Sequence, residues 1–179
     1  MHWRTAVSMT ISAAAIVVGV VAVWPQPTAV APSNTAPADA QLLIVRTVLS
    51  GDTVELVAGT PGVQVPRWGT VTARLIGVHA PNFGITDECY AAESQGRLAK
   101  WLPRGAVAWV STDTTKRDAN GRWLAYIWTA DGRLVNQLIV SDGFARTTDP
   151  GDNLRLWPEI ERAGAQAASR FAGLWLDCR

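Results

Sequence analysis

The interpretation of this chain depends on two short stretches, SGDTVEL at residues 50–56 and RLIGVHAPN at residues 74–82. In the first, Gly51 and Asp52 separate two runs of apolar and β-branched residues, which is typical of a β-hairpin. We expect this pair to supply the special backbone angles of the turn. The second stretch alternates like a strand as far as Val78 and then reaches a proline, which ends strands. Together the stretches predict three strands, the third over residues 71–78.

The pattern on either side of these stretches predicts two more strands and three helices. Five short strands, with one helix before the fourth strand and two helices after the fifth, indicate an α+β domain. We expect a small closed β-barrel with antiparallel strands and helices packed at one end, because closure removes exposed sheet edges. The predicted later strands are residues 106–110 and 122–128, and the predicted helices are residues 91–102, 134–141 and 158–170.

The first forty residues have a different composition from the rest. Residues 6–24 contain no charged side chain, and their length lies between that of a signal-peptide core and that of a membrane-spanning helix. We therefore predict a signal peptide or an N-terminal membrane anchor at residues 1–24, and both alternatives stay open. Residues 25–40, rich in Pro, Ala, Thr and Ser, predict a disordered linker, and residues 41–179 the folded domain. The leader predicts export, either as a secreted or as a membrane-anchored protein.

Charge and cysteine content add two constraints. The chain contains sixteen Lys and Arg and fifteen Asp and Glu, so it lacks the strongly basic character that holds long nucleic acid. This balance neither proves nor excludes a phosphodiester substrate, and we expect a monomer. The two cysteines, Cys89 and Cys178, predict one disulfide in an oxidising compartment, worth about 4–5 kcal/mol before strain. Two unrelated buried thiols are the alternative, and metal ligation is less favoured because the cysteines form no short ligand cluster.

In order and spacing, several motifs of residues 42–178 resemble the staphylococcal nuclease (thermonuclease) family. Each motif alone is weak, but the whole series is specific. The resemblance implies a five-stranded barrel of the oligonucleotide-binding (OB-fold) type with three helices. The matching segments are Gly51–Val54, Arg74–Val78, Ala80-Pro81, Asp118, Gly121-Arg122, Leu124–Tyr126, Val135-Asn136, Gly143–Arg146 and Gly173–Trp175.

The resemblance also implies a chemistry, because this family cleaves DNA and RNA phosphodiesters with one Ca²⁺. Asp52 matches the first metal-binding carboxylate of the family. Arg74 and Arg122 match the two arginines that grip the phosphate, a task suited to the planar guanidinium fork. Asp118 and Asn120 are the expected substrate-binding positions, and Asn120 takes the place often held by a nucleotide-stacking tyrosine.

Besides Asn120, three positions depart from the family pattern. His79 stands where a second metal-binding Asp is expected, Asn82 where the Glu that orients the water is expected, and Ser50 replaces a further acid. A neutral amide cannot accept a proton, and imidazole is a poor ligand for Ca²⁺ but a good one for Zn²⁺, Cu²⁺ or Ni²⁺. We therefore expect weakened Ca²⁺ binding, with Asp52 and His79 as the remaining candidate ligands for a divalent metal.

Alternative interpretations stay open for the individual residues. His79 is either a general base, since an unperturbed imidazole has a suitable pKa, or a loop histidine without a catalytic role. Asp87 and Glu88, on the same loop, either compensate for the lost acids or are simply solvated. The two arginines bind phosphate or form structural ion pairs with Asp52 and Asp118.

At the level of function, three hypotheses follow. The first is an exported nuclease-family protein with reduced or altered metal-dependent activity on DNA or RNA. The second is an inactive relative that binds nucleic acid or another phosphate-bearing ligand through Arg74 and Arg122. The third is a protein-interaction module whose cleft is vestigial. An unaltered Ca²⁺-dependent nuclease fits the sequence least well.

Overall fold

In the computed structural model the chain is described at residues 37–62, 64–65, 68–84 and 86–178. The predicted leader at residues 1–24 and most of the predicted linker at residues 25–40 lie outside the described residues. Both assignments therefore stay predictions. Among the described helices, none has the length and apolar character needed to cross a membrane.

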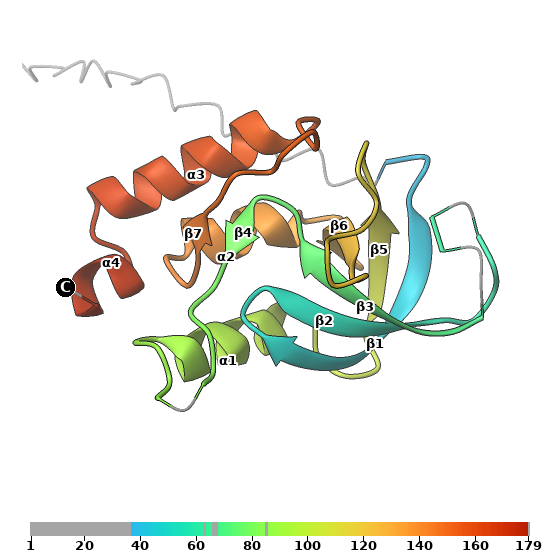
Figure 1. Ribbon diagram of the computed structural model, residues 1–179, viewed down its shortest axis with the longest axis horizontal. Coiled ribbons are helices and arrows are strands. Elements are labelled where there is room, and N and C mark those ends of the chain that lie inside the picture. The colour runs from blue at the N-terminus through green and yellow to red at the C-terminus, as the bar shows by residue number, and fades with distance from the viewer. Residues whose placement is uncertain (1–36, 63, 66–67, 85, 179) are drawn as a thin grey trace, which may run out of the picture. The chain divides into compact units, whose positions relative to one another are not determined.

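A closed barrel of five strands forms the body of the domain (Figure 1), so the predicted barrel is confirmed. The strands follow one another around the barrel in the order β1-β2-β3-β6-β5, and β5 pairs with β1 to close the ring. All pairs are antiparallel except β3 with β6, which is parallel, so the expectation of purely antiparallel closure was wrong. In a ring with an odd number of strands, strict alternation of direction cannot continue all the way round. The strands are β1 (Gln41–Ser50), β2 (Thr53–Ala58), β3 (Gly69–Leu75), β5 (Val107–Ser111) and β6 (Trp123–Thr129).

The long strand β1 closes the barrel because it pairs with two neighbours along its length. Residues 41–44 pair with β5, and the part from Ile44 onward pairs with β2. Register shifts between Val45 and Thr47 and between Val48 and Ser50 interrupt the second pairing. Irregularities of this kind bend and twist a strand, which lets β1 curve from one neighbour to the other.

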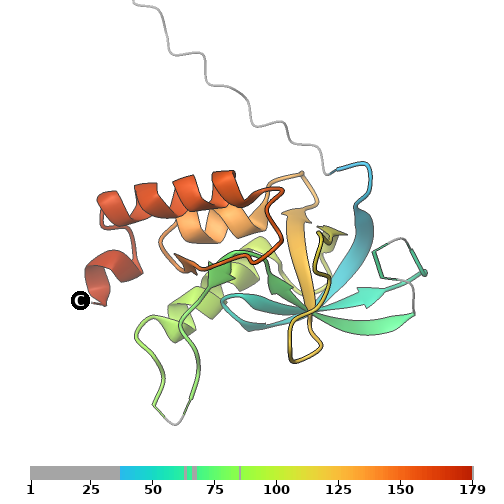
Figure 2. The same cartoon turned by 45° about the horizontal axis from the view of Figure 1, so that its top comes forward.

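Four helices accompany the barrel, and Figures 1 and 2 both show α3 running beside α2. The three predicted helices are confirmed, with Pro158 in the first turn of α3 as expected. Gly143 follows α2 with φ +78°, and a Cβ there would lie 2.2 Å from the carbonyl oxygen of Ala172, so only glycine fits. The short α4 was not predicted. The helices are α1 (Ala91–Trp101), α2 (Val135–Ser141), α3 (Trp157–Ser169) and α4 (Leu174–Asp177).

The third predicted strand is divided in two. β3 ends at Leu75, and after a turn at Gly77 (φ +71°) the chain forms β4 (Val78–His79), which pairs with β7 (Arg146–Thr147). The left-handed backbone of Gly77, which other residues rarely adopt, redirects the chain out of the barrel wall. His79 therefore belongs to a separate two-stranded sheet beside the helices.

The turn between β1 and β2 also differs from its expected geometry. Gly51 does not adopt a positive φ, so the expectation of a special backbone angle at this glycine was wrong. Its role is close packing, because a Cβ there would lie 2.5 Å from Cβ of Ser94 and 2.6 Å from Cβ of Ala80. This glycine lets the Asp52 turn lie directly against α1 and the end of β4.

Candidate functional site

The Asp52 carboxylate lies in the hairpin turn between β1 and β2, and its side chain is almost completely buried. Its Oδ1 accepts hydrogen bonds from the hydroxyls of Ser50 at 3.0 Å and Thr53 at 2.7 Å. Its Oδ2 accepts one from the backbone N–H of Ala80 at 3.3 Å and lies 3.2 Å from Nη2 of Arg74. Each oxygen therefore already has two partners from the protein itself.

Arg74 comes from the end of β3, where it pairs in register with Thr53 of β2. The next residue, Leu75, donates its backbone N–H to the backbone oxygen of Asp52 at 2.9 Å, which fixes the two chains at this point. The Arg74 side chain is a quarter exposed. Because a guanidinium carries five N–H donors and its ion pair with Asp52 is formed by Nη2, donors remain for an external anion.

Arg122 is held by a tight turn that precedes β6. The Asp118 Oδ1 accepts hydrogen bonds from the backbone N–H groups of Asn120 and Arg122, both at 2.9 Å. Its Oδ2 accepts the Arg122 Nε at 2.7 Å. Burial alone would raise the pKa of Asp118, but its hydrogen bonds with Arg122 and Asn120 outweigh this, so the pKa lies below the usual value. Asp118 is therefore a carboxylate that orients Arg122.

Pairing of the barrel strands brings the two arginines near each other. Arg74 pairs with Leu124 in the parallel β3–β6 ladder, and Arg122 lies two residues before Leu124, directly before the start of β6. Asn136, fully buried on α2, forms hydrogen bonds with the segment after β3 and with β6. Its Nδ2 donates to the carbonyl oxygens of Ile76 at 3.0 Å and Ala125 at 3.1 Å. One side chain thus links the residue after the end of β3 to the interior of β6.

His79 and Asn82 lie apart from this pairing. His79, partly exposed in β4, stands opposite Arg146 of β7, and its imidazole makes no hydrogen bond within the described residues. Asn82 is exposed, and its backbone N–H donates to Glu88 Oε2 at 2.9 Å while its carbonyl accepts the Glu88 N–H at 3.0 Å. The loop from Asn82 to Glu88 is therefore closed on itself.

The calcium ion that the sequence resemblance implies does not fit this donor set. Ca²⁺ takes six to eight oxygen ligands, whereas Asp52 is engaged by protein donors. Asp87 binds the backbone N–H of Gly84 at 3.1 Å, and Glu88 binds that of Asn82. Over the described part of the chain, no three His, Cys, Asp or Glu side chains come close enough to hold a metal ion. The roles predicted for Asp52 and His79 as metal ligands therefore stay predictions.

A pocket of about 320 Å³ opens beside Arg74. Its walls come from the turn after β3, from residues 115–118 and from the loop at residues 148–153. Arg74 and Asp118 both line it, so the arginine of β3 and the carboxylate that orients Arg122 face the same hollow. The sequence interpretation missed the third wall, whose only signal was the turn-forming run Asp149-Pro150-Gly151.

The predicted disulfide is confirmed. Cys89 and Cys178 are bonded with a Cα–Cα distance of 5.8 Å, across 89 residues of sequence. Cys89 directly follows the loop from Asn82 to Glu88, and Cys178 directly follows α4. The loop that carries one predicted catalytic position is therefore covalently tied to the C-terminal segment.

Comparisons with known proteins agree with this geometry. The sequence model of the family described as "Staphylococcal nuclease homologue" matches residues 72–177. Endonuclease YhcR of Bacillus subtilis is 30% identical over 142 residues, which cover 74% of this chain and 11% of that protein. An uncharacterized endonuclease of Escherichia coli O157:H7 is 28% identical over 142 residues, covering 78% of this chain and 80% of its own length. The chain thus spans about a tenth of the Bacillus relative and most of the Escherichia coli one.

Proposed function

The chain belongs to the staphylococcal nuclease homologue family, and on that premise we propose that it is an exported protein acting on DNA or RNA. In this proposal Arg74 and Arg122 bind the phosphodiester, and hydrolysis has a reduced or altered dependence on metal. The Bacillus and Escherichia coli relatives carry the name endonuclease, which supports phosphodiesters as the substrate class. Retention at a membrane through residues 1–24 is part of the proposal as an alternative to secretion.

The observation that carries the proposal is the full set of partners around Asp52. A cation at Asp52 would have to displace Arg74 or the hydroxyl donors of Ser50 and Thr53. A single carboxylate already neutralised by a guanidinium offers little net negative charge to a hard divalent cation. This arrangement supports the proposed reduction in Ca²⁺ dependence.

Phosphate binding is supported by the two arginines. Asp118 holds Arg122 through Nε, which leaves the terminal nitrogens of that guanidinium for a phosphate. Arg74 contacts Asp52 through Nη2. Guanidinium groups fixed in advance stabilise the charge that builds on phosphate oxygens during hydrolysis without further reorganisation.

Hydrolysis also needs a group that takes a proton from the attacking water. Asn82 cannot serve because its amide is neutral, and Asp87 and Glu88 are hydrogen-bonded to loop backbone. His79 is the group we assign to this step. Its imidazole would accept the water proton as the new P–O bond forms, and the departing oxygen would take a proton from solvent.

A second candidate function is binding without turnover. It is favoured by the same loop, because the Asn82 position holds an amide and the neighbouring acids are used to close the loop. In that case the two arginines still bind nucleic acid, and the chain acts as a phosphate-binding module.

One assay separates these functions. The full chain is incubated with labelled single-stranded DNA and RNA in EDTA, Ca²⁺, Mn²⁺ or Zn²⁺, beside Arg122→Ala and the double variant His79→Asp/Asn82→Glu. Arg162→Ala, which removes an exposed arginine of α3, is the matched control. Cleavage by the parent that Arg122→Ala abolishes and Arg162→Ala keeps supports the nuclease.

Other outcomes point elsewhere. Binding without cleavage in the parent, with Ca²⁺-dependent cleavage gained in the double variant, supports the inactive phosphate-binding module. Absence of both binding and cleavage in the parent and the double variant contradicts both functions and leaves the protein-interaction module.

A further inference from the structure

The pocket beside Arg74 has the size of a small-ligand site. Its volume of about 320 Å³ lies at the lower end of the range of roughly 300–1,000 Å³ found for small-molecule pockets. Such a volume suits one nucleobase rather than a length of polymer. Because Arg74 stands at its edge, a nucleotide with its phosphate on that arginine would have its base within reach of the pocket.

The walls do not offer stacking. Among the residues that the structure describes, no aromatic side chain lines the pocket, so a base would be held by apolar contact and hydrogen bonds. Leu75 and Leu124 contribute apolar surface, and Asp149 and Asp152 contribute carboxylates from the 148–153 loop. Oδ1 of Asp149 accepts the backbone N–H of Gly151 at 2.9 Å. The carboxylate of Asp152 makes no hydrogen bond or ion pair within the described residues.

A second, independent feature is an unpartnered donor at the pocket. Asn153 lines it and is only 1% exposed. Its Oδ1 accepts the backbone N–H of Thr115 at 2.8 Å, so the orientation of the amide is set. Its Nδ2 has no hydrogen-bond partner in the described part of the structure. Buried donors are rarely left without an acceptor, and an oxygen of a ligand in the pocket would supply one.

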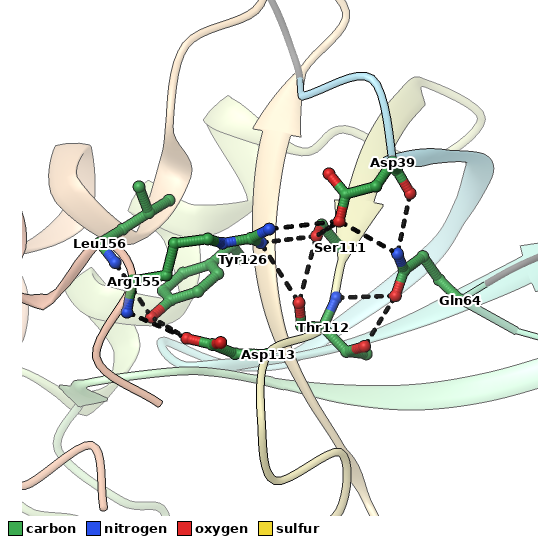
Figure 3. Close-up of polar contacts among 8 residues, drawn as sticks. All are labelled: Asp39, Gln64, Ser111, Thr112, Asp113, Tyr126, Arg155 and Leu156. Atoms are coloured by element: carbon green, nitrogen blue, oxygen red, sulfur yellow. Dashed lines mark hydrogen bonds and ion pairs between the residues drawn. The ribbon is translucent and has the colours of Figure 1, made fainter. Parts of the chain in front are cut away.

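The loop that carries these groups is attached firmly to the barrel. Thr148 donates its N–H to the carbonyl of Gly77 at 3.1 Å. Figure 3 shows Arg155 reaching from the end of the loop to Asp39, at 3.2 Å, and to the hydroxyl of Ser111, at 2.6 Å. A wall fixed in this way is preformed, which lowers the entropy lost on binding.

From these features we propose that the pocket is a base-recognition subsite that prefers guanine. Guanine presents two adjacent N–H donors, which a carboxylate of Asp149 or Asp152 can accept together, and a carbonyl oxygen that can accept from Asn153. Thymine and uracil have one ring N–H and no amino group, so they cannot offer a carboxylate two adjacent donors. The inference rests on the proposed function, because phosphate at Arg74 is what brings the base to the pocket.

The test is a titration of the full chain with dGMP, dAMP, dCMP and dTMP. Calorimetry measures the affinity for each nucleotide, and NMR spectra monitor the side-chain amide signal of Asn153. We expect dGMP to bind about tenfold more tightly than dTMP and to shift the Asn153 signal. The double variant Asp149→Asn/Asp152→Asn should reduce that preference to less than about twofold. Glu161→Gln, an exposed acid of α3, is the matched control and should retain the preference.

The outcomes distinguish this inference from the function on which it rests. Equal binding of all four nucleotides, with loss of binding in Arg74→Gln, overturns the base preference and leaves the proposed function standing. A guanine preference that survives in the double variant overturns the assignment to these carboxylates. No binding of any nucleotide contradicts both proposals.

Discussion

Asp52 and Arg74 form a side-chain ion pair of 3.2 Å, and the neighbour of Arg74, Leu75, donates its backbone N–H to the Asp52 backbone oxygen. The pair places a guanidinium beside a buried carboxylate, since a charge removed from water needs a partner. It also places an internal anion on one of the two arginines predicted to bind phosphate. An incoming phosphate must therefore share Arg74 with Asp52.

The first prediction concerns the stability of this pair. Asp52→Asn removes the negative charge beside Arg74 and places an amide group among donors that now bind a carboxylate. Because hydrogen bonds to charged groups contribute more than neutral ones, we expect the free energy of unfolding to fall by about 2 kcal/mol or more. Urea denaturation monitored by circular dichroism measures it. A loss as small as that of the exposed control Asp87→Asn would contradict the prediction.

A metal site should bind Ca²⁺ most strongly when all three departing positions are made acidic together. Ser50→Asp alone removes a hydrogen-bond donor from Asp52 and adds a second charge beside it, so we expect destabilisation. In the triple variant Ser50→Asp/His79→Asp/Asn82→Glu, saturating Ca²⁺ should raise Tm by about 5 °C or more. Scanning calorimetry with Ca²⁺ or EDTA measures this. An equal Ca²⁺ shift in the parent would show that the parent already holds the ion.

Much of the fold was predictable because its signals are local. Alternating apolar residues marked the strands, and Pro158 and Gly143 marked a helix start and a helix end. The division of the third strand was not predictable, because it depends on Gly77 meeting Trp157 of α3, where a Cβ would lie 3.1 Å from the ring. That contact arises only once the helices have packed.

The candidate site could likewise be predicted only where the sequence signal is local. The resemblance to the nuclease family indicated Asp52, Arg74, Arg122 and Asp118. The sequence left phosphate binding and ion pairing as alternatives for the arginines. Both ion pairs are present. The loop at residues 148–153 was not recognised, because its role depends on Asn153 and Arg155 meeting segments far away in the sequence.

The disulfide gives a prediction about redox conditions. Cys89→Ser/Cys178→Ser removes a cross-link that spans 89 residues, so the unfolded chain gains conformational freedom. We expect the free energy of unfolding to fall by about 2–5 kcal/mol. Urea denaturation of the variant and of the parent treated with a reducing agent should give the same loss. If reduction leaves the midpoint of the parent unchanged, the disulfide does not stabilise the domain.

The last prediction follows from Tyr126, whose side chain is fully buried beneath the loop that lines the pocket. Its hydroxyl lies 2.9 Å from the carbonyl oxygen of Asn153 and accepts the Leu156 N–H at 3.3 Å. Burial raises the pKa of Tyr126 to about 12, from an ordinary value of 10.0. The folded state thus holds the proton more tightly than the unfolded state does.

The sign of the pH dependence follows directly. Below pH 10 the tyrosine is protonated in both states, so its contribution to stability is fully present. As pH rises from 10 toward 12 the unfolded chain ionises first, and the free energy of unfolding should fall by roughly 2 kcal/mol.

Tyr126→Phe should be less stable at pH 7, because the hydrogen bonds with Asn153 and Leu156 are lost. The variant should also lack this part of the decrease in stability at high pH. Urea denaturation at pH 7, 10 and 11.5 measures both effects, with Tyr90→Phe as the control for the second tyrosine. An identical alkaline decline in the parent and in Tyr126→Phe would show that the buried hydroxyl does not cause it.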